Sequence, residues 1–147
     1  VKKNINQDEM NTKILNHLAY EAKNCCKKSL ENKKIIHMFI KNYKVNNQSY
    51  SNFPNDINGE SLSLDIKFIA IDEAHIKKIE KILKKYQISL HKILNANYVE
   101  NFLSENETNI FLMAKKITEG FNVNEVTFIA KSAKKRGFFE KFFDFFS

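Results

Sequence analysis

The sequence predicts a mixed α/β (α+β) domain in which a small mixed sheet is flanked by helices. Three observations support this class. Segments with helical spacing of apolar residues alternate with segments of strand spacing, 43% of the 147 residues are hydrophobic, and no internal repeat interrupts the pattern. A chain of this length normally forms one domain around one core. After this body we expect a separate C-terminal amphipathic helix.

The first expected element is a helix from Asn6 to Lys28. Asn6 and Glu9 have the spacing of a capping box, and Lys27 and Lys28 suit the C-terminal end of the helix dipole. Apolar side chains at helical spacing predict one face buried on a sheet; they are Met10, Ile14, Leu15, Leu18, Ala22 and Cys25. Cys25 and the adjacent Cys26 are interpreted as core and boundary residues.

Two strands separated by a polar loop are predicted next. Residues 35–45 are rich in β-branched and aromatic side chains, and residues 46–58 form the loop. Residues 62–71 alternate between apolar and polar, which predicts a strand with one face toward the core. The apolar set is Leu62, Leu64, Ile66, Phe68 and Ala70.

A second helix is predicted directly after these strands. Asp72 can cap it, and its lysines would form the solvated face. The expected buried face consists of Ile76, Ile79, Ile82, Leu83 and Tyr86. Residues 88–94 then predict a short strand, and residues 96–103 one or two helical turns.

The last helix and strand of the body follow. Ser104 and Glu107 have the spacing of another capping box, and Gly120 stands where a C-terminal cap belongs. Between them, Ile110, Met113, Ala114 and Ile117 lie on one helical face. Residues 123–130 predict a final strand.

No sequence pattern indicates catalysis or metal binding. The histidines are scattered over different predicted elements without metal-ligand spacing, and each is expected at the surface or at the boundary of the core; they are His17, His37, His75 and His91. The 3 glycines leave no glycine-rich phosphate loop, and no serine has the glycine neighbours of a nucleophile elbow. We therefore expect no enzyme and no cofactor.

The formal net charge of +7 comes almost entirely from lysine, and Arg136 is the only arginine. Arginine usually performs base recognition, so sequence-specific reading of nucleic acid is not expected. Nonspecific attraction to phosphates or to a membrane surface stays open. The 2 cysteines and the lack of a secretory signal predict a reducing cytoplasm.

The final eleven residues, 137–147, predict an amphipathic helix that lies flat on a membrane. At about 100° per residue the phenylalanines occupy one arc of roughly 160°; they are Phe138, Phe139, Phe142, Phe143, Phe145 and Phe146. Basic side chains suited to anionic headgroups accompany them; these are Lys134, Lys135, Arg136 and Lys141. The segment is shorter than the ~20 residues that span a bilayer. A helix packed on the protein's own core is the alternative.

Several motifs in the middle of the chain occur together; they are Ile35-Ile36-His37-Met38-Phe39, Tyr43-Lys44-Val45, Pro54 with Gly59, and the alternating residues 62–70. In this order they resemble the bacterial cell-division protein FtsA, a member of the actin-like family. The resemblance extends over residues 74–86, 88–94 and 98–107. FtsA proteins also end in a basic linker and a short amphipathic membrane helix.

The departures from FtsA define what the resemblance implies. The family typically has a strand of the form hydrophobic-hydrophobic-His-x-hydrophobic-Pro and a loop with Asn-Pro-x-Gly-x-x-Gly. Here Ile40 replaces the strand proline, and Asp56 replaces the first glycine of the loop. The two phosphate-binding loops and the subdomain that receives the FtsZ tail have no counterpart. The chain therefore resembles a reduced or fragmentary FtsA relative, for which neither ATP binding nor FtsZ binding is carried over.

The resemblance implies three parts. Residues 1–72 correspond to the strand-helix-strand-strand side subdomain without its first strand, residues 73–130 to a remnant of an actin-like subdomain, and residues 131–147 to a basic linker and membrane-targeting helix. It implies a non-enzymatic adaptor that tethers division proteins or FtsA-like molecules to the inner face of the cytoplasmic membrane. A basic nucleic-acid-binding domain and a non-functional fragment of a decayed FtsA gene are the alternatives.

Overall fold

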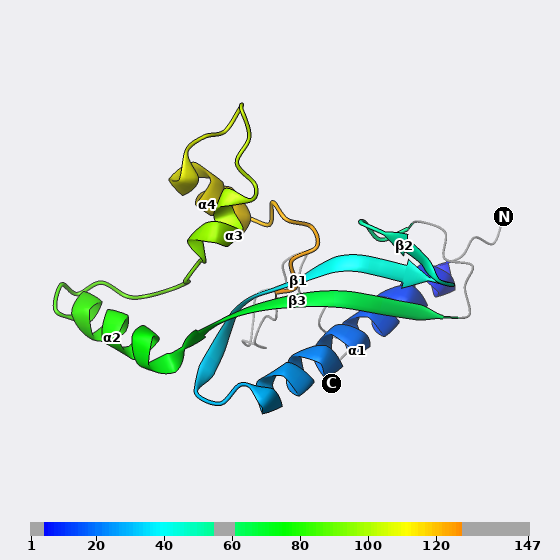
Figure 1. Ribbon diagram of the computed structural model, residues 1–147, viewed down its shortest axis with the longest axis horizontal. Helices are drawn as coiled ribbons and strands as arrows, with labels where there is room; N and C mark the ends of the chain where they lie inside the picture. The colour runs from blue at the N-terminus through cyan, green and yellow to red at the C-terminus, as the bar shows by residue number, and fades with distance from the viewer. Residues whose placement is uncertain (1–4, 55–60, 128–147) are drawn as a thin grey trace.

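The structure is a computed structural model that describes residues 5–54 and 61–127, with side chains described from residue 12 onward. Its elements confirm a mixed α+β architecture (Figure 1). In chain order they are α1 (Ile5–Ser29), β1 (Lys33–Val45), β2 (Gln48–Tyr50), β3 (Leu62–Asp72), α2 (Glu73–Lys84), α3 (Ala96–Glu100) and α4 (Ile110–Thr118).

The three described strands form an antiparallel sheet in the order β2-β1-β3. The expectation of a mixed sheet is therefore wrong for the described strands, because β2 and β3 each pair with β1 in the antiparallel direction. Strand β2 lies inside the predicted loop. Asn46 and Asn47 have φ angles of 48° and 67°, and Val45 pairs with Gln48, so a two-residue hairpin turn joins β1 to β2.

Helix α1 runs along one face of the sheet (Figure 1). Four large side chains of β1 are buried; they are Met38, Ile40, Tyr43 and Val45. On β3 the expected alternation holds from Leu62 to Phe68, with the apolar side chains half-buried.

The buried face of α1 differs from the predicted one. Ala19 is buried, whereas Ile14 is 41% exposed and Cys25 is exposed. Cys26 is half-buried, as the boundary interpretation requires, but the core interpretation of Cys25 is wrong. Strand β1 supplies the bulky side chains of the core between α1 and the sheet. The helix therefore contributes a small residue, Ala19, to this core.

A second core covers the opposite face of the sheet at one end. Tyr98 and Val99 from α3 are buried together with Met113 and Ile117 from α4. Phe39 and Ile69, which belong to β1 and β3, pack against this cluster along with other half-buried residues. The predicted apolar face of α4 is confirmed.

Helix α4 begins and ends at different kinds of cap. Asn109 opens it, because its side-chain oxygen accepts hydrogen bonds from two backbone N–H groups of the first turn. Ser104 and Glu107 instead form an isolated β-bridge, so the predicted capping box is wrong. Gly120, with a φ of 91°, follows the helix as predicted, and the N–H of Phe121 bonds to the carbonyl of Lys116.

Two predicted strands are absent from the described residues. Residues 88–94 have no regular structure, and the N–H of Ile88 instead bonds back to the carbonyl of Leu83 at the end of α2. Within residues 123–127 the structure shows one isolated bridge, between Glu125 and Phe39, in place of a strand. Residues 128–130 of that prediction lie outside the described residues.

Helix α2 packs on the end of β3 and leaves most of its surface exposed (Figure 1). Ile76 is buried, but Ile79, Ile82 and Tyr86 are exposed, so most of the predicted buried face is wrong. No second layer of the described structure covers this side of the helix. Asp72 precedes the helix, but its side chain makes no capping hydrogen bond.

Candidate functional site

The buried His37 is the centre of a polar network that joins β1 to α3 and to residues 122–125. His37 is 1% exposed. Ile35 pairs with Ala70, whereas His37 pairs with Ile69, so Ile36 is the extra residue of a β-bulge. The bulge turns Ile35 and His37 toward opposite faces of the sheet, although they are two residues apart.

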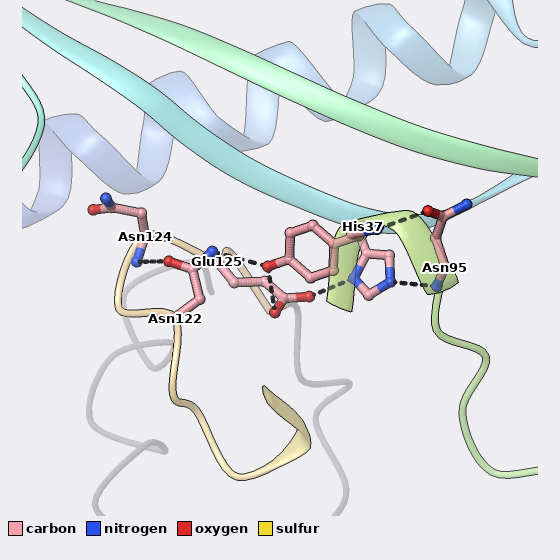
Figure 2. Close-up of polar contacts among 6 residues, drawn as sticks. His37, Asn95, Asn122, Asn124 and Glu125 are labelled. Carbon is pink, nitrogen blue, oxygen red and sulfur yellow. Dashed lines mark hydrogen bonds and ion pairs between the residues drawn. The ribbon is translucent and has the colours of Figure 1, made fainter. Parts of the chain in front are cut away.

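Hydrogen bonds indicate which tautomer the His37 ring adopts. Its Nε2 accepts a hydrogen bond of 3.0 Å from the backbone N–H of Asn95. Because a backbone N–H can only donate, Nε2 carries no proton, and the proton of the neutral ring resides on Nδ1. Nδ1 lies 2.8 Å from Oε1 of Glu125 and donates to it. Both nitrogens of the ring are therefore engaged (Figure 2).

Two hydrogen-bond donors compensate for the burial of the Glu125 carboxylate. Its side chain is 8% exposed, and its second oxygen accepts a hydrogen bond of 3.0 Å from the hydroxyl of Tyr98. Burial raises the pKa of the Glu125 carboxyl, but the hydrogen bonds from His37 and Tyr98 and the charge of Lys92 lower this pKa by more, so it lies below its ordinary value. The carboxylate therefore stays ionised at neutral pH.

Tyr98 connects this polar network to the second core. Its ring centroid lies 4.1 Å from that of His37, 5.1 Å from that of Phe39 and 5.2 Å from that of Phe102. Its hydroxyl accepts a 2.8 Å hydrogen bond from the side-chain amide of Asn122. Burial, aided by the charge of Glu125, raises the pKa of Tyr98, so its hydroxyl remains a donor.

Backbone pairing holds residues 124–126 along the edge of β1 that faces away from β3. The N–H of Ile40 donates to the carbonyl of Asn124 at 2.9 Å, and the N–H of Val126 donates to the carbonyl of Met38 at 2.8 Å. This pairing places Glu125 opposite Phe39 and on the same face as His37.

The side chain of Asn124 adds contacts around this pairing. The Tyr43 hydroxyl donates to Oδ1 of Asn124 at 3.0 Å, and Nδ2 of Asn124 donates to the carbonyl of Ser51 at 3.0 Å. The N–H of Asn124 also donates to Oδ1 of Asn122 (Figure 2). We call this network the C-terminal clamp; it consists of His37, Tyr43, Tyr98, Asn122, Asn124 and Glu125.

The C-terminal clamp has the chemistry of a structural connection. Both ring nitrogens of His37 and both carboxylate oxygens of Glu125 are already engaged in hydrogen bonds. The hollow beside them, partly lined by Lys23 and Lys92, has a volume of about 190 Å³, below the roughly 300 Å³ of a typical ligand pocket. Within the described residues, no group of three or more potential metal ligands occurs.

The predicted membrane-binding residues follow the clamp in sequence and lie outside the described residues, which end at Thr127. They are Lys134, Lys135, Arg136, Phe138, Phe139, Lys141, Phe142, Phe143, Phe145 and Phe146. Within the described part, none of the helices is both long and apolar enough to cross a membrane.

The sequence did not predict the C-terminal clamp. The expectation that His37 lies at the surface or boundary is wrong, because the bulge turns its ring into the second core. The other histidines are exposed as expected. One local signal was present, since Asn122-Val-Asn-Glu125 concentrates polar side chains just after the helix-ending Gly120. The pairing of His37 with Glu125 spans 88 positions, and nothing local in the sequence indicates it.

A scan against protein-family models, a search of curated proteins and a search of solved structures each find no match to this chain.

Proposed function

We propose that this protein is a non-enzymatic adaptor that attaches to the cytoplasmic face of a membrane through residues 131–147. The observation that carries the proposal is the tail sequence, in which a basic segment precedes six phenylalanines on one helical arc. The body would present bound division proteins or FtsA-like molecules at that membrane, as the resemblance to FtsA implies. ATP and FtsZ are not among the proposed ligands.

The tail has the energetics of a reversible anchor. A fully buried phenylalanine contributes roughly 1.5–3 kcal/mol, but a helix lying in the interface buries only one face. Ordering the backbone opposes binding by about 1 kcal/mol or more per residue. Lys134, Lys135 and Arg136 each add about 1 kcal/mol near an anionic surface, and salt screens this attraction.

The C-terminal clamp supports this proposal from the side of the body. An adaptor connects its anchor to its cargo, so an ordered attachment of the chain to the body shortly before the tail suits this role. Residues 124–126 are paired to the central strand β1, and Glu125 is held by His37 and Tyr98. In this proposal the clamp fixes the base of the tail to the sheet.

Flotation of the full chain with liposomes tests the proposal. The parent should float with vesicles that contain anionic lipid and should remain unbound with purely zwitterionic vesicles. Phe142→Asp combined with Phe143→Asp should release the protein at every salt concentration. Neutralising Lys134, Lys135 and Arg136 should weaken binding mainly at low salt, because this contribution is screened.

A matched double substitution controls for added charge and lost apolar surface. Phe111 and Leu112 on α4 are 82% and 51% exposed, so Phe111→Asp with Leu112→Asp introduces the same charges outside the tail. This control should float like the parent. If the tail variant also floated like the parent, the proposed anchor would be refuted. Binding to DNA that depends on the lysines and ignores the phenylalanine changes would support the nucleic-acid alternative.

A further inference from the structure

Helix α2 projects from the end of the sheet as an exposed arm (Figure 1). Ile76 is its one buried residue. Isolated helices of about 12 residues are marginal in water, so a helix with so little packing gains from a further surface to lie on. The side chains that α2 presents indicate what kind of surface that is.

An apolar row is left uncovered on α2 and on the turn that follows it. Ile79 is 38% exposed, Ile82 49%, Tyr86 72% and Ile88 54%. At about 100° per residue, Ile79, Ile82 and Tyr86 fall within an arc of roughly 60°. Ile79, Ile82 and Tyr86 form one stripe, which we call the α2 stripe.

Lysines border the α2 stripe and carboxylates avoid it. Lys78 and Lys85 are exposed and lie within about 60° of Ile82 around the helix axis. Glu73 and Glu80, the only acidic residues of α2, lie about 160–180° from Ile82. A ligand that covers the stripe therefore meets positive charge at its margin.

We propose that the α2 stripe binds the surface of an anionic lipid bilayer, as a second contact beside the tail. The inference rests on the proposed function, since a membrane adaptor already holds its body near such a surface. Charge complementarity and amphipathic shape favour this occupant: isoleucines and a tyrosine enter the interface, while the flexible lysines extend to anionic headgroups. Two weak contacts on one chain strengthen each other by avidity.

Charge reversal on α2 should weaken vesicle binding of the full chain strongly. Lys78→Glu with Lys85→Glu should raise the apparent Kd for vesicles rich in anionic lipid by about thirty-fold or more. The estimate follows because each lysine near such a surface contributes about 1 kcal/mol, and 1.4 kcal/mol corresponds to a factor of ten. The matched control is Lys41→Glu with Lys44→Glu, two exposed lysines of β1 with the same change in net charge. It should change the Kd by less than about three-fold. Lys44 pairs with Ser63, nine residues along β3 from Asp72, so at about 3.3 Å per residue this end of β1 lies well over a Debye length from the start of α2.

A spectroscopic probe reports on α2 separately from the tail. The chain contains no tryptophan, so Tyr86→Trp introduces a single one at an exposed position of the stripe. On adding anionic vesicles its emission should shift to the blue, and lipids brominated in their acyl chains should quench it. Circular dichroism of each variant checks that the fold is retained.

The outcomes distinguish this inference from the proposed anchor. Tryptophan emission that stays typical of water while the chain floats with vesicles would overturn the α2 contact and leave the tail intact. If the two charge-reversal pairs raised the apparent Kd for vesicles equally, the α2 contact would also be overturned, because the attraction would then depend only on net charge. Failure of the tail variant to release the protein refutes the anchor alone. An α2 that stays in water and binds an acidic peptide would assign the stripe to a protein partner instead.

Discussion

Replacing Glu125 by alanine should lower the free energy of unfolding by about 2–4 kcal/mol. The substitution removes the acceptor of the His37 Nδ1–H and of the Tyr98 hydroxyl, at 2.8 and 3.0 Å. His37 and Tyr98 are 1% and 2% exposed, so water cannot readily replace the carboxylate. Two buried donors would thus be left without a partner.

The magnitude follows from these two donors. Each unsatisfied buried donor costs about 1–3 kcal/mol, which gives roughly 2–6 kcal/mol for the pair. Removing Glu125 also relieves the desolvation of its carboxylate, which reduces the net loss. The remaining 2–4 kcal/mol is a large share of the ~5–15 kcal/mol typical of a domain, and for a chain of this length corresponds to a fall in Tm of very roughly 6–15 °C.

Denaturation by urea, followed by circular dichroism, measures the change directly. Glu125→Gln should cost less than Glu125→Ala, because an amide oxygen can still accept from His37. Glu105→Ala is the matched control, since Glu105 is exposed in a turn. Its effect should stay within about 0.5 kcal/mol.

The pH dependence tests the same carboxylate. The pKa of Glu125 lies below that of an unfolded glutamate, about 4.3, so the unfolded chain binds a proton more readily than the folded protein. The contribution of the ionised Glu125 to the free energy of unfolding is therefore complete above about pH 4.3. It is lost as the pH falls through the lower pKa of the folded state. The difference in free energy of unfolding between the parent and Glu125→Gln should become smaller in that acidic range. An unchanged gap, or a Glu125→Ala variant as stable as the Glu105→Ala control, would refute the role given to the clamp.

Two further substitutions test local features of the fold. Asn109→Ala should cost about 1 kcal/mol because it removes the observed cap of α4, whereas Ser104→Ala, at the cap position expected from the sequence, should change stability by less than 0.5 kcal/mol; equal effects in urea melts would contradict the observed start of α4. Gln87→Gly should stabilise the protein by about 0.5–1 kcal/mol, because Gln87 has a φ of 58°, which a side chain disfavours and glycine adopts freely. A lower Tm for that variant would argue against the left-handed turn after α2.

The sequence by itself determined the elements whose signals are local. Helical spacing located α1 and α4, β-branched content and alternation located β1 and β3, and Gly120 marked the end of α4. Periodicity and capping depend on neighbours within a few positions, so they can be read without knowing the rest of the fold. The amphipathic character of residues 137–147 is a property of the same kind, and their binding to membranes remains a prediction.

Tertiary structure decided which of these faces find a partner. The β-branched and aromatic content of β1 gave no warning of the extra residue Ile36, which turns His37 into the second core and within reach of Glu125. Helix α2 has an apolar stripe as clear as that of α4, yet it stays exposed because nothing in the described structure lies over it. A hydrophobic period specifies which side chains share a face; burial of that face depends on distant segments that the period does not encode.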